Sequence, residues 1–69
     1  RDKQFAEAAR VADQAVLTHP HSRRCHKLRI ASHKRLGDKA KARRFARDAL
    51  ALFPNDDEFA KLASSISAG

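Results

Sequence analysis

Residues 37–55 read GDKAKARRFARDALALFPN, and they contain the clearest helical pattern in the chain. It opens with Gly37, which suits the end of one helix, and Asp38, which suits the start of the next. Up to Pro54, small and apolar side chains then recur every three or four residues, as they do along one face of an α-helix. That face carries Ala42, Phe45, Ala46, Ala49, Leu50 and Phe53. The pattern predicts a helix over residues 39–53.

Three helix-breaking residues divide the whole chain in the same way. Pro20, Gly37 and Pro54 separate four stretches, each of a length that suits one helix. Ser22 is the expected N-cap of the second stretch. The predicted helices span residues 3–18, 23–36, 39–53 and 56–67, within one segment of 69 residues. Short connections between consecutive helices imply antiparallel neighbours, so we predict an all-α fold of helical hairpins.

Apolar residues at helical spacing identify the face that each of the other helices should bury. In the first helix these are Phe5, Ala8, Ala9, Ala12 and Val16, and in the last they are Phe59, Leu62, Ala63 and Ile66. In the second helix we expect Cys25, Leu28, Ser32 and Leu36 to face the core.

The two halves of the chain also resemble each other. Pro20 and Pro54 are 34 residues apart, and sliding the sequence by that distance gives nine identical pairs among 35. Five of the pairs are alanine or leucine at positions that belong to the predicted core faces or lie beside them. They are Ala8/Ala42, Ala12/Ala46, Ala15/Ala49, Ala6/Ala40 and Leu28/Leu62. This recurrence indicates one repeated packing unit.

A 34-residue period in helical hairpins is typical of the tetratricopeptide repeat, whose pattern is W-x2-L-G-x2-Y, then A-x3-F, then P. The chain resembles that family through Cys25-x2-Leu28-Arg29-x2-Ser32, Gly37-Asp38, Ala42-x3-Ala46, Ala49-Leu50 and Pro54-Asn55. The resemblance implies a right-handed superhelix of four helices. The alternative that the pattern leaves open is a closed four-helix bundle.

The family resemblance further implies a groove, lined by the first helix of each repeat, that holds a peptide. If the second helix buries Cys25, Leu28 and Ser32, the side about a quarter to a half turn away should present a cation-rich surface with one apolar residue at its centre, to which the last helix adds Lys61. The expected partner-binding residues are Arg23, His26, Lys27, Ile30, His33, Lys34 and Lys61. The net charge of +7 also favours an acidic partner.

We therefore expect a scaffold module for protein–protein interaction that binds an acidic peptide, helix or protein surface and belongs to a longer chain or assembly. The alternative is nucleic-acid binding through the same basic face. Because Phe5, Phe45, Phe53 and Phe59 lie in core phase, no aromatic platform for stacking bases is predicted, which makes nucleic acid the weaker of the two.

The sequence gives no support for catalysis, a metal or a membrane. Cys25 and His26 are adjacent in a helix and face about 100° apart, so they do not form a nucleophile–base pair. The four histidines lack the convergence of a zinc site. We expect no enzymatic activity, no cofactor and no metal. No run of about 20 apolar residues is present, and the single cysteine fits a cytoplasmic protein.

Overall fold

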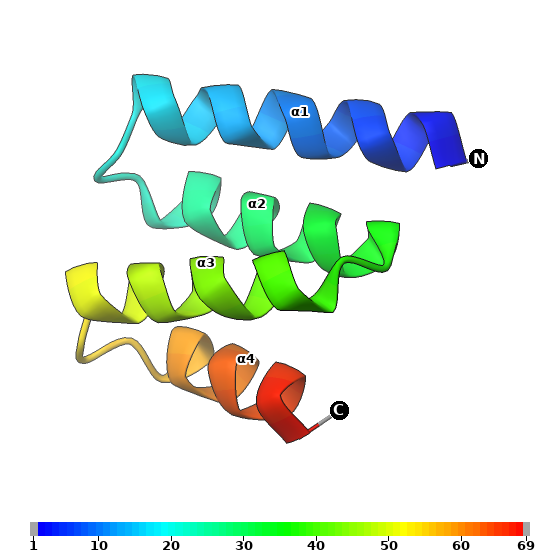
Figure 1. The fold of residues 1–69 in the computed structure, drawn as a ribbon. Coiled ribbons are helices and arrows are strands. Elements are labelled where there is room, and N and C mark those ends of the chain that lie inside the picture. Colours follow the sequence, from blue (N-terminus) through cyan, green and yellow to red (C-terminus); the bar gives the residue numbers. More distant parts are fainter. Residues whose placement is uncertain (1, 69) are drawn as a thin grey trace.

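The computed structural model describes residues 2–68 and shows four α-helices in this range, with no strands (Figure 1). They are α1 (Asp2–Thr18), α2 (Arg23–Leu36), α3 (Lys39–Leu52) and α4 (Asp57–Ala68). The fold is thus all-α, as predicted. Each helix begins and ends within one residue of the range expected from the sequence.

Local capping explains why α2 and α3 have these bounds. The Ser22 hydroxyl accepts a hydrogen bond from the backbone N–H of Cys25, and the Asp38 carboxylate accepts one from Lys41. Gly37 ends α2 with φ of 91°, in the left-handed region that glycine reaches without strain. Its N–H and that of Asp38 satisfy carbonyls in the last turn of α2. The caps predicted at Ser22, Gly37 and Asp38 are confirmed.

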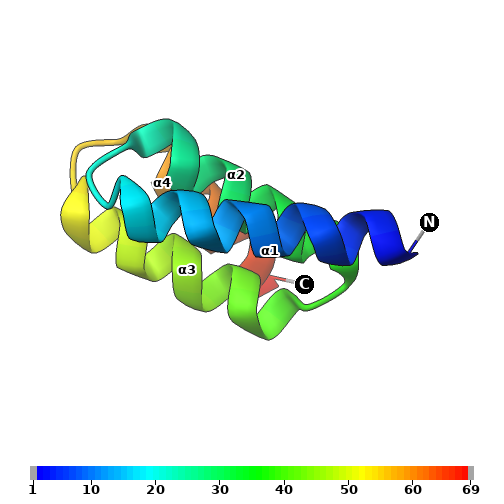
Figure 2. The same ribbon diagram turned by 90° about the horizontal axis from the view of Figure 1, so that it is seen from above.

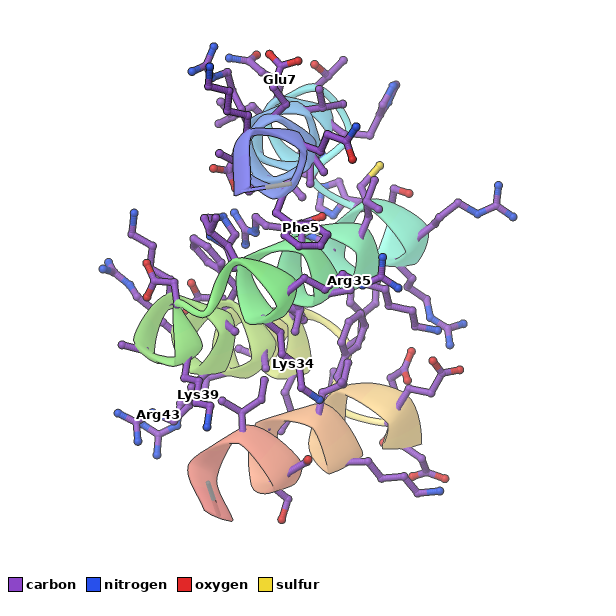
Figure 3. All side chains as sticks on the ribbon, turned by 90° about the vertical axis from the view of Figure 1, so that its right-hand side faces the viewer. Phe5, Glu7, Lys34, Arg35, Lys39 and Arg43 are labelled. Atoms are coloured by element: carbon purple, nitrogen blue, oxygen red, sulfur yellow. The ribbon has the colours of Figure 1, made fainter. Side chains whose placement is uncertain are left out.

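The helices pack in a row. Extensive contacts join α1 to α2, α2 to α3 and α3 to α4, while among the described residues α1 and α4 do not pack against each other. Seen from above and end-on, α2 and α3 lie on opposite sides of the line between α1 and α4 (Figures 2 and 3). The Cα extents are 33 × 30 × 13 Å, so the molecule is a flat slab with α1 and α4 at its two edges.

The largest core cluster lies where α2, α3 and α4 meet. It is built from Ile30, Ala42, Ala46, Ala49, Phe59 and Ile66. Ile30 and Phe59 are fully buried, and the three alanines of α3 are fully buried too. Because an alanine fills little space, the larger side chains of α2 and α4 can reach α3 closely.

The buried face of α2 differs from the one that the sequence predicts. Leu28 and Leu36 are 47% and 39% exposed, and Cys25 is half-buried, so only Ser32 of the expected set is buried. The residues that α2 buries against α3 are His26, Ile30 and His33. The expectation that Leu28 and Leu36 face the core is therefore wrong.

The cause lies in the number of helices that α2 contacts. It packs between α1 and α3 and reaches α4, so its core arc is wide, and polar rings occupy part of it. The His26 ring packs edge-on against Phe53 at 5.9 Å between centroids, and the His33 ring lies 5.0 Å from that of Phe45. Because two of the buried residues are histidines, the pattern of aliphatic residues alone does not identify the buried face of α2.

Candidate functional site

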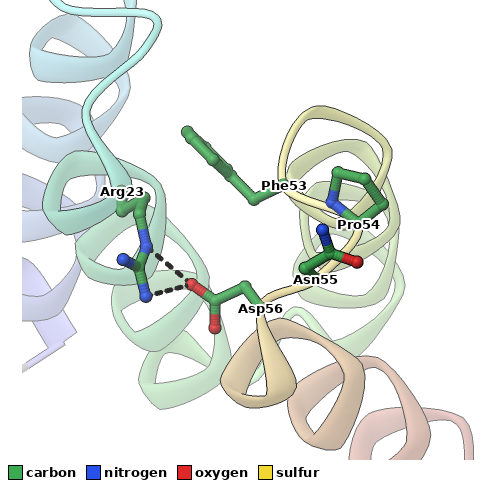
Figure 4. A pocket seen from close by; sticks show the side chains of 5 residues that line it. All are labelled: Arg23, Phe53, Pro54, Asn55 and Asp56. Atoms are coloured by element: carbon green, nitrogen blue, oxygen red, sulfur yellow. Dashed lines mark hydrogen bonds and ion pairs between the residues drawn. The ribbon is translucent and has the colours of Figure 1, made fainter.

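Arg23, which the sequence predicts to bind a partner carboxylate, forms an ion pair within the molecule while its side chain remains 57% exposed. Its Nε donates to Asp56 Oδ2 at 2.7 Å, and its Nη2 reaches the same oxygen (Figure 4). Asp56 precedes α4, and its Oδ1 accepts from the backbone N–H of Glu58 at 2.9 Å. The Asp56 side chain is only 4% exposed. The pair joins the start of α2 to the start of α4 beside the turn that contains Pro54.

Burial of the Asp56 carboxyl opposes its ionisation, but stabilising contacts outweigh that effect. Hydrogen bonds from Arg23 and from the backbone N–H groups of Glu58 and Phe59, together with the Arg23 charge, lower the pKa of Asp56 below its ordinary value. A lowered pKa in the folded state stabilises the fold above the unfolded pKa, near pH 4, and this contribution is lost as the pH falls through the folded value.

We predict that Asp56→Asn destabilises the chain at pH 7, because it removes the charge that holds Arg23. The difference in unfolding free energy between the original chain and the variant should shrink as the pH falls below about 4, because Asp56 then takes up a proton in the unfolded chain while the folded chain still resists protonation. Urea denaturation of both proteins at pH 7 and pH 3 measures this difference in unfolding free energy. The control is Asp57→Asn, at an exposed neighbour with no ion pair among the described residues. A difference for Asp56→Asn that stays constant with pH would contradict the role assigned to this pair.

Lys27 is also paired internally. Its Nζ lies 3.1 Å from Glu58 Oε2 and 5.7 Å from the centre of the Phe59 ring. Glu58 is exposed, so this ion pair lies at the surface and contributes little to stability. The ion pairs Arg23–Asp56 and Lys27–Glu58 therefore both join a basic residue of α2 to an acidic residue at the start of α4.

Three further members of the predicted groove are buried, so the prediction that they contact a partner is corrected. Ile30 is fully buried, and the rings of His26 and His33 lie between helices. His26 Nε2 donates to the carbonyl of Pro20 at 2.7 Å, since a carbonyl can only accept. His33 Nε2 lies 3.0 Å from Asp13 Oδ1 on α1. These side chains hold α2 against its neighbours.

Arg29 completes this buried junction. Its guanidinium carbon lies 3.9 Å from the centre of the Phe45 ring, a cation–π contact between α2 and α3. Burial lowers the pKa of Arg29, and the carboxylates of Asp13 and Asp48 oppose the shift. The sequence missed this residue because its partners come from two other helices.

Lys34 and Lys61 are exposed members of the predicted site that form no ion pair with another described residue. Lys34 lines a hollow of about 100 Å³ between the end of α2 and α4, together with Lys39, Ser65 and Ile66. Figure 3 shows Lys34 directed toward α4. The structure therefore brings Lys34 to α4 but leaves the cation-rich groove without its expected central residue, Ile30.

A different strip of α2 is open to solvent. Its members are Arg24, Leu28, Ala31 and Arg35, which we call the α2 outer stripe. Its apolar part borders a hollow of about 240 Å³ between α1 and α2, lined by Phe5, Ala8, Leu28, Ala31, Ser32 and Arg35. Figure 3 shows Phe5 between the two helices. The stripe thus combines an apolar floor with an arginine near each end.

The outward face of α3 carries a second group of cations, which we call the α3 basic ridge. It consists of Lys39, Lys41, Arg43, Arg44 and Arg47. All five are exposed, and none forms an ion pair with another described residue. Lys39 and Arg43 project outward in Figure 3. The excess of basic residues in α3 can be counted in the sequence. Whether these residues are exposed depends on which face α3 buries.

The arrangement offers surfaces for binding. Within residues 2–68, His, Cys, Asp and Glu side chains form no group of three or more that could hold a metal ion. None of the helices described is long and apolar enough to cross a membrane. No protein-family model, curated protein or solved structure matches this chain.

Proposed function

We propose that the chain is a protein–protein interaction module that binds an acidic peptide, helix or protein surface by contact and without catalysis. The observation that carries this proposal is the α2 outer stripe. Leu28 and Ala31 supply apolar area, and Arg24 and Arg35 supply bidentate donors for carboxylates. Lys34 and Lys61 extend the same positive field toward α4.

The proposal includes a tetratricopeptide-like arrangement. The family pattern has two aromatic positions seven residues apart, and His26 and His33 have that spacing. Placing the first half of the pattern one residue later than the sequence suggested puts these buried rings at both aromatic positions. Ile30 then occupies the small-residue position between them. This alignment agrees with the burial of α2 better than the earlier one, which placed Cys25 and Ser32 at the aromatic positions.

Packing between consecutive helices supports an open array over a closed bundle, since a bundle would bring α4 back onto α1. We propose that the row is a segment of a right-handed superhelix within a longer chain or assembly that acts as a cytoplasmic scaffold.

The α3 basic ridge favours a second candidate function, binding to the phosphate backbone of nucleic acid. Lys39, Arg43 and Arg47 are spaced four residues apart and share one side of the helix, so their charges repeat about every 6 Å. Such contacts bind without reading sequence and weaken steeply as salt displaces them.

One experiment separates the two functions. Arg24→Glu/Arg35→Glu alters the α2 outer stripe, and Arg44→Glu/Arg47→Glu alters the α3 basic ridge by the same change in net charge. The affinity for a fluorescent Glu-rich, Leu-containing peptide should fall about tenfold or more with the first variant and little with the second. Equal effects of both variants on the peptide would contradict the proposed surface. Binding to random duplex DNA alone, lost with the second variant, would establish the other function.

A further inference from the structure

We propose that the acidic partner is an amphipathic helix that docks across α1 and α2 in the way that α2 docks across α3 and α4. This inference rests on the proposed function and specifies the partner's conformation and position. It starts from the 34-residue relation, which makes α1 equivalent to α3 and α2 equivalent to α4. Equivalent positions should be equally buried unless a helix is present at one place and absent at the other.

The positions on α1 show this difference. Ala42 is fully buried on α3, whereas its equivalent Ala8 is exposed. Phe45 is half-buried beneath Arg29 of α2, whereas its equivalent Val11 is 62% exposed. On α3, Phe45 is covered by Arg29 of α2, and Ala42 belongs to the core cluster that includes Ile30 of α2. The corresponding side of α1 is therefore bare where a helix placed like α2 would lie.

The positions on α2 show the same difference. Phe59 is fully buried on α4 and contacts Lys27 of α2, whereas its equivalent Cys25 is half-buried. Leu62 is half-buried, whereas its equivalent Leu28 is 47% exposed. The bare positions on the two helices flank the 240 Å³ hollow that Phe5 and Leu28 line. Together they form one docking face for a helix antiparallel to α1.

Charge indicates what this helix carries. In the covered half, basic Lys27 of α2 meets acidic Glu58 at the start of α4. The residue equivalent to Glu58 is Arg24, so the sign at this position is reversed. A helix docked in the equivalent place should present a carboxylate to Arg24, near its own N-terminal half. Its remaining contacts with Val11 and Leu28 require apolar side chains at a spacing of three or four residues.

A second copy of the chain fits this face poorly. Its α4 is equivalent to α2, but the positions of α4 that correspond to His26 and Ile30 are Ala60 and Ser64. These small side chains cannot fill the space over α1 as rings and an isoleucine do. The α4 of a second copy therefore does not match the occupant, which is an amphipathic helix with a carboxylate for Arg24 and apolar side chains for Val11 and Leu28.

The probe is a synthetic peptide that copies residues 22–37 with every Arg and Lys replaced by Glu and the cysteine by Ala. It should bind with a gain of helicity in circular dichroism, and a version with Pro in place of the isoleucine should fail to bind. Val11→Glu in the chain should weaken binding about tenfold, while Leu52→Glu, at an exposed α3 position, should leave it unchanged. Both variants should retain the helicity of the original chain.

The outcomes are distinguishable. If Arg24→Glu/Arg35→Glu weakens probe binding but Val11→Glu does not, the α2 outer stripe binds the peptide without α1, and the helix-docking inference is wrong although the proposed function stands. If neither variant matters, both are wrong. Concentration-dependent self-association in sedimentation velocity that Val11→Glu abolishes would identify a second copy as the occupant and overturn the inference.

Discussion

Phe59→Ala should cost about 3–5 kcal/mol of unfolding free energy, the usual range for removing a fully buried phenylalanine. The ring connects three helices. It is stacked with Phe53 at 5.7 Å between centroids, covered by Lys27, and part of the cluster around Ile30 and Ala46. Its loss leaves a cavity that the fully buried alanines of α3 cannot fill.

The size of this effect matters because the chain is small. A protein of this length has roughly 3–10 kcal/mol of total stability, so a loss of this size removes a large part of it. Urea denaturation followed by circular dichroism measures the loss. Leu52→Ala, at an exposed α3 position, is the control and should change stability little. If Phe59→Ala has no measurable folded state, Phe59→Leu should retain a transition with a smaller loss. A loss for Phe59→Ala similar to that for Leu52→Ala would contradict the described core.

Local chemistry explains why the helices could be predicted closely from the sequence. Ser22, Gly37 and Asp38 act on backbone groups within a few residues of themselves, so their effects do not depend on the rest of the fold. The buried faces of α3 and α4 were also predicted, because alanine and phenylalanine leave one clear apolar stripe on each.

The candidate site was harder to predict because its residues depend on distant partners. Arg23 and Lys27 look free in the sequence, but their carboxylate partners Asp56 and Glu58 follow more than 30 residues later. His26 and His33 are polar by residue type, yet their rings pack against Phe53 and Phe45 between helices. The spacing of the two histidines was the available signal.

The α2 outer stripe is exposed because α2 is rotated about its axis relative to the orientation that the sequence predicts. Once Ile30 faces α3, Leu28 must lie about 160° around the helix axis and point away from that contact. The predicted groove was therefore rotated on α2, and its cations shifted from Arg23 and Lys27 to Arg24 and Arg35. The basic character of the surface survives this rotation because cations occur on several sides of the helix.

The helix α2 turns Ile30 toward α3 and leaves Leu28 open beside α1. The most direct test compares the unfolding free energies of Ile30→Ala and Leu28→Ala in urea. The structure predicts a loss of about 2–5 kcal/mol for Ile30→Ala, which empties a fully buried site, and about 1 kcal/mol for Leu28→Ala, where half of the side chain is already in water. An equal or larger loss for Leu28→Ala would contradict this orientation of α2 and the binding surface inferred from it.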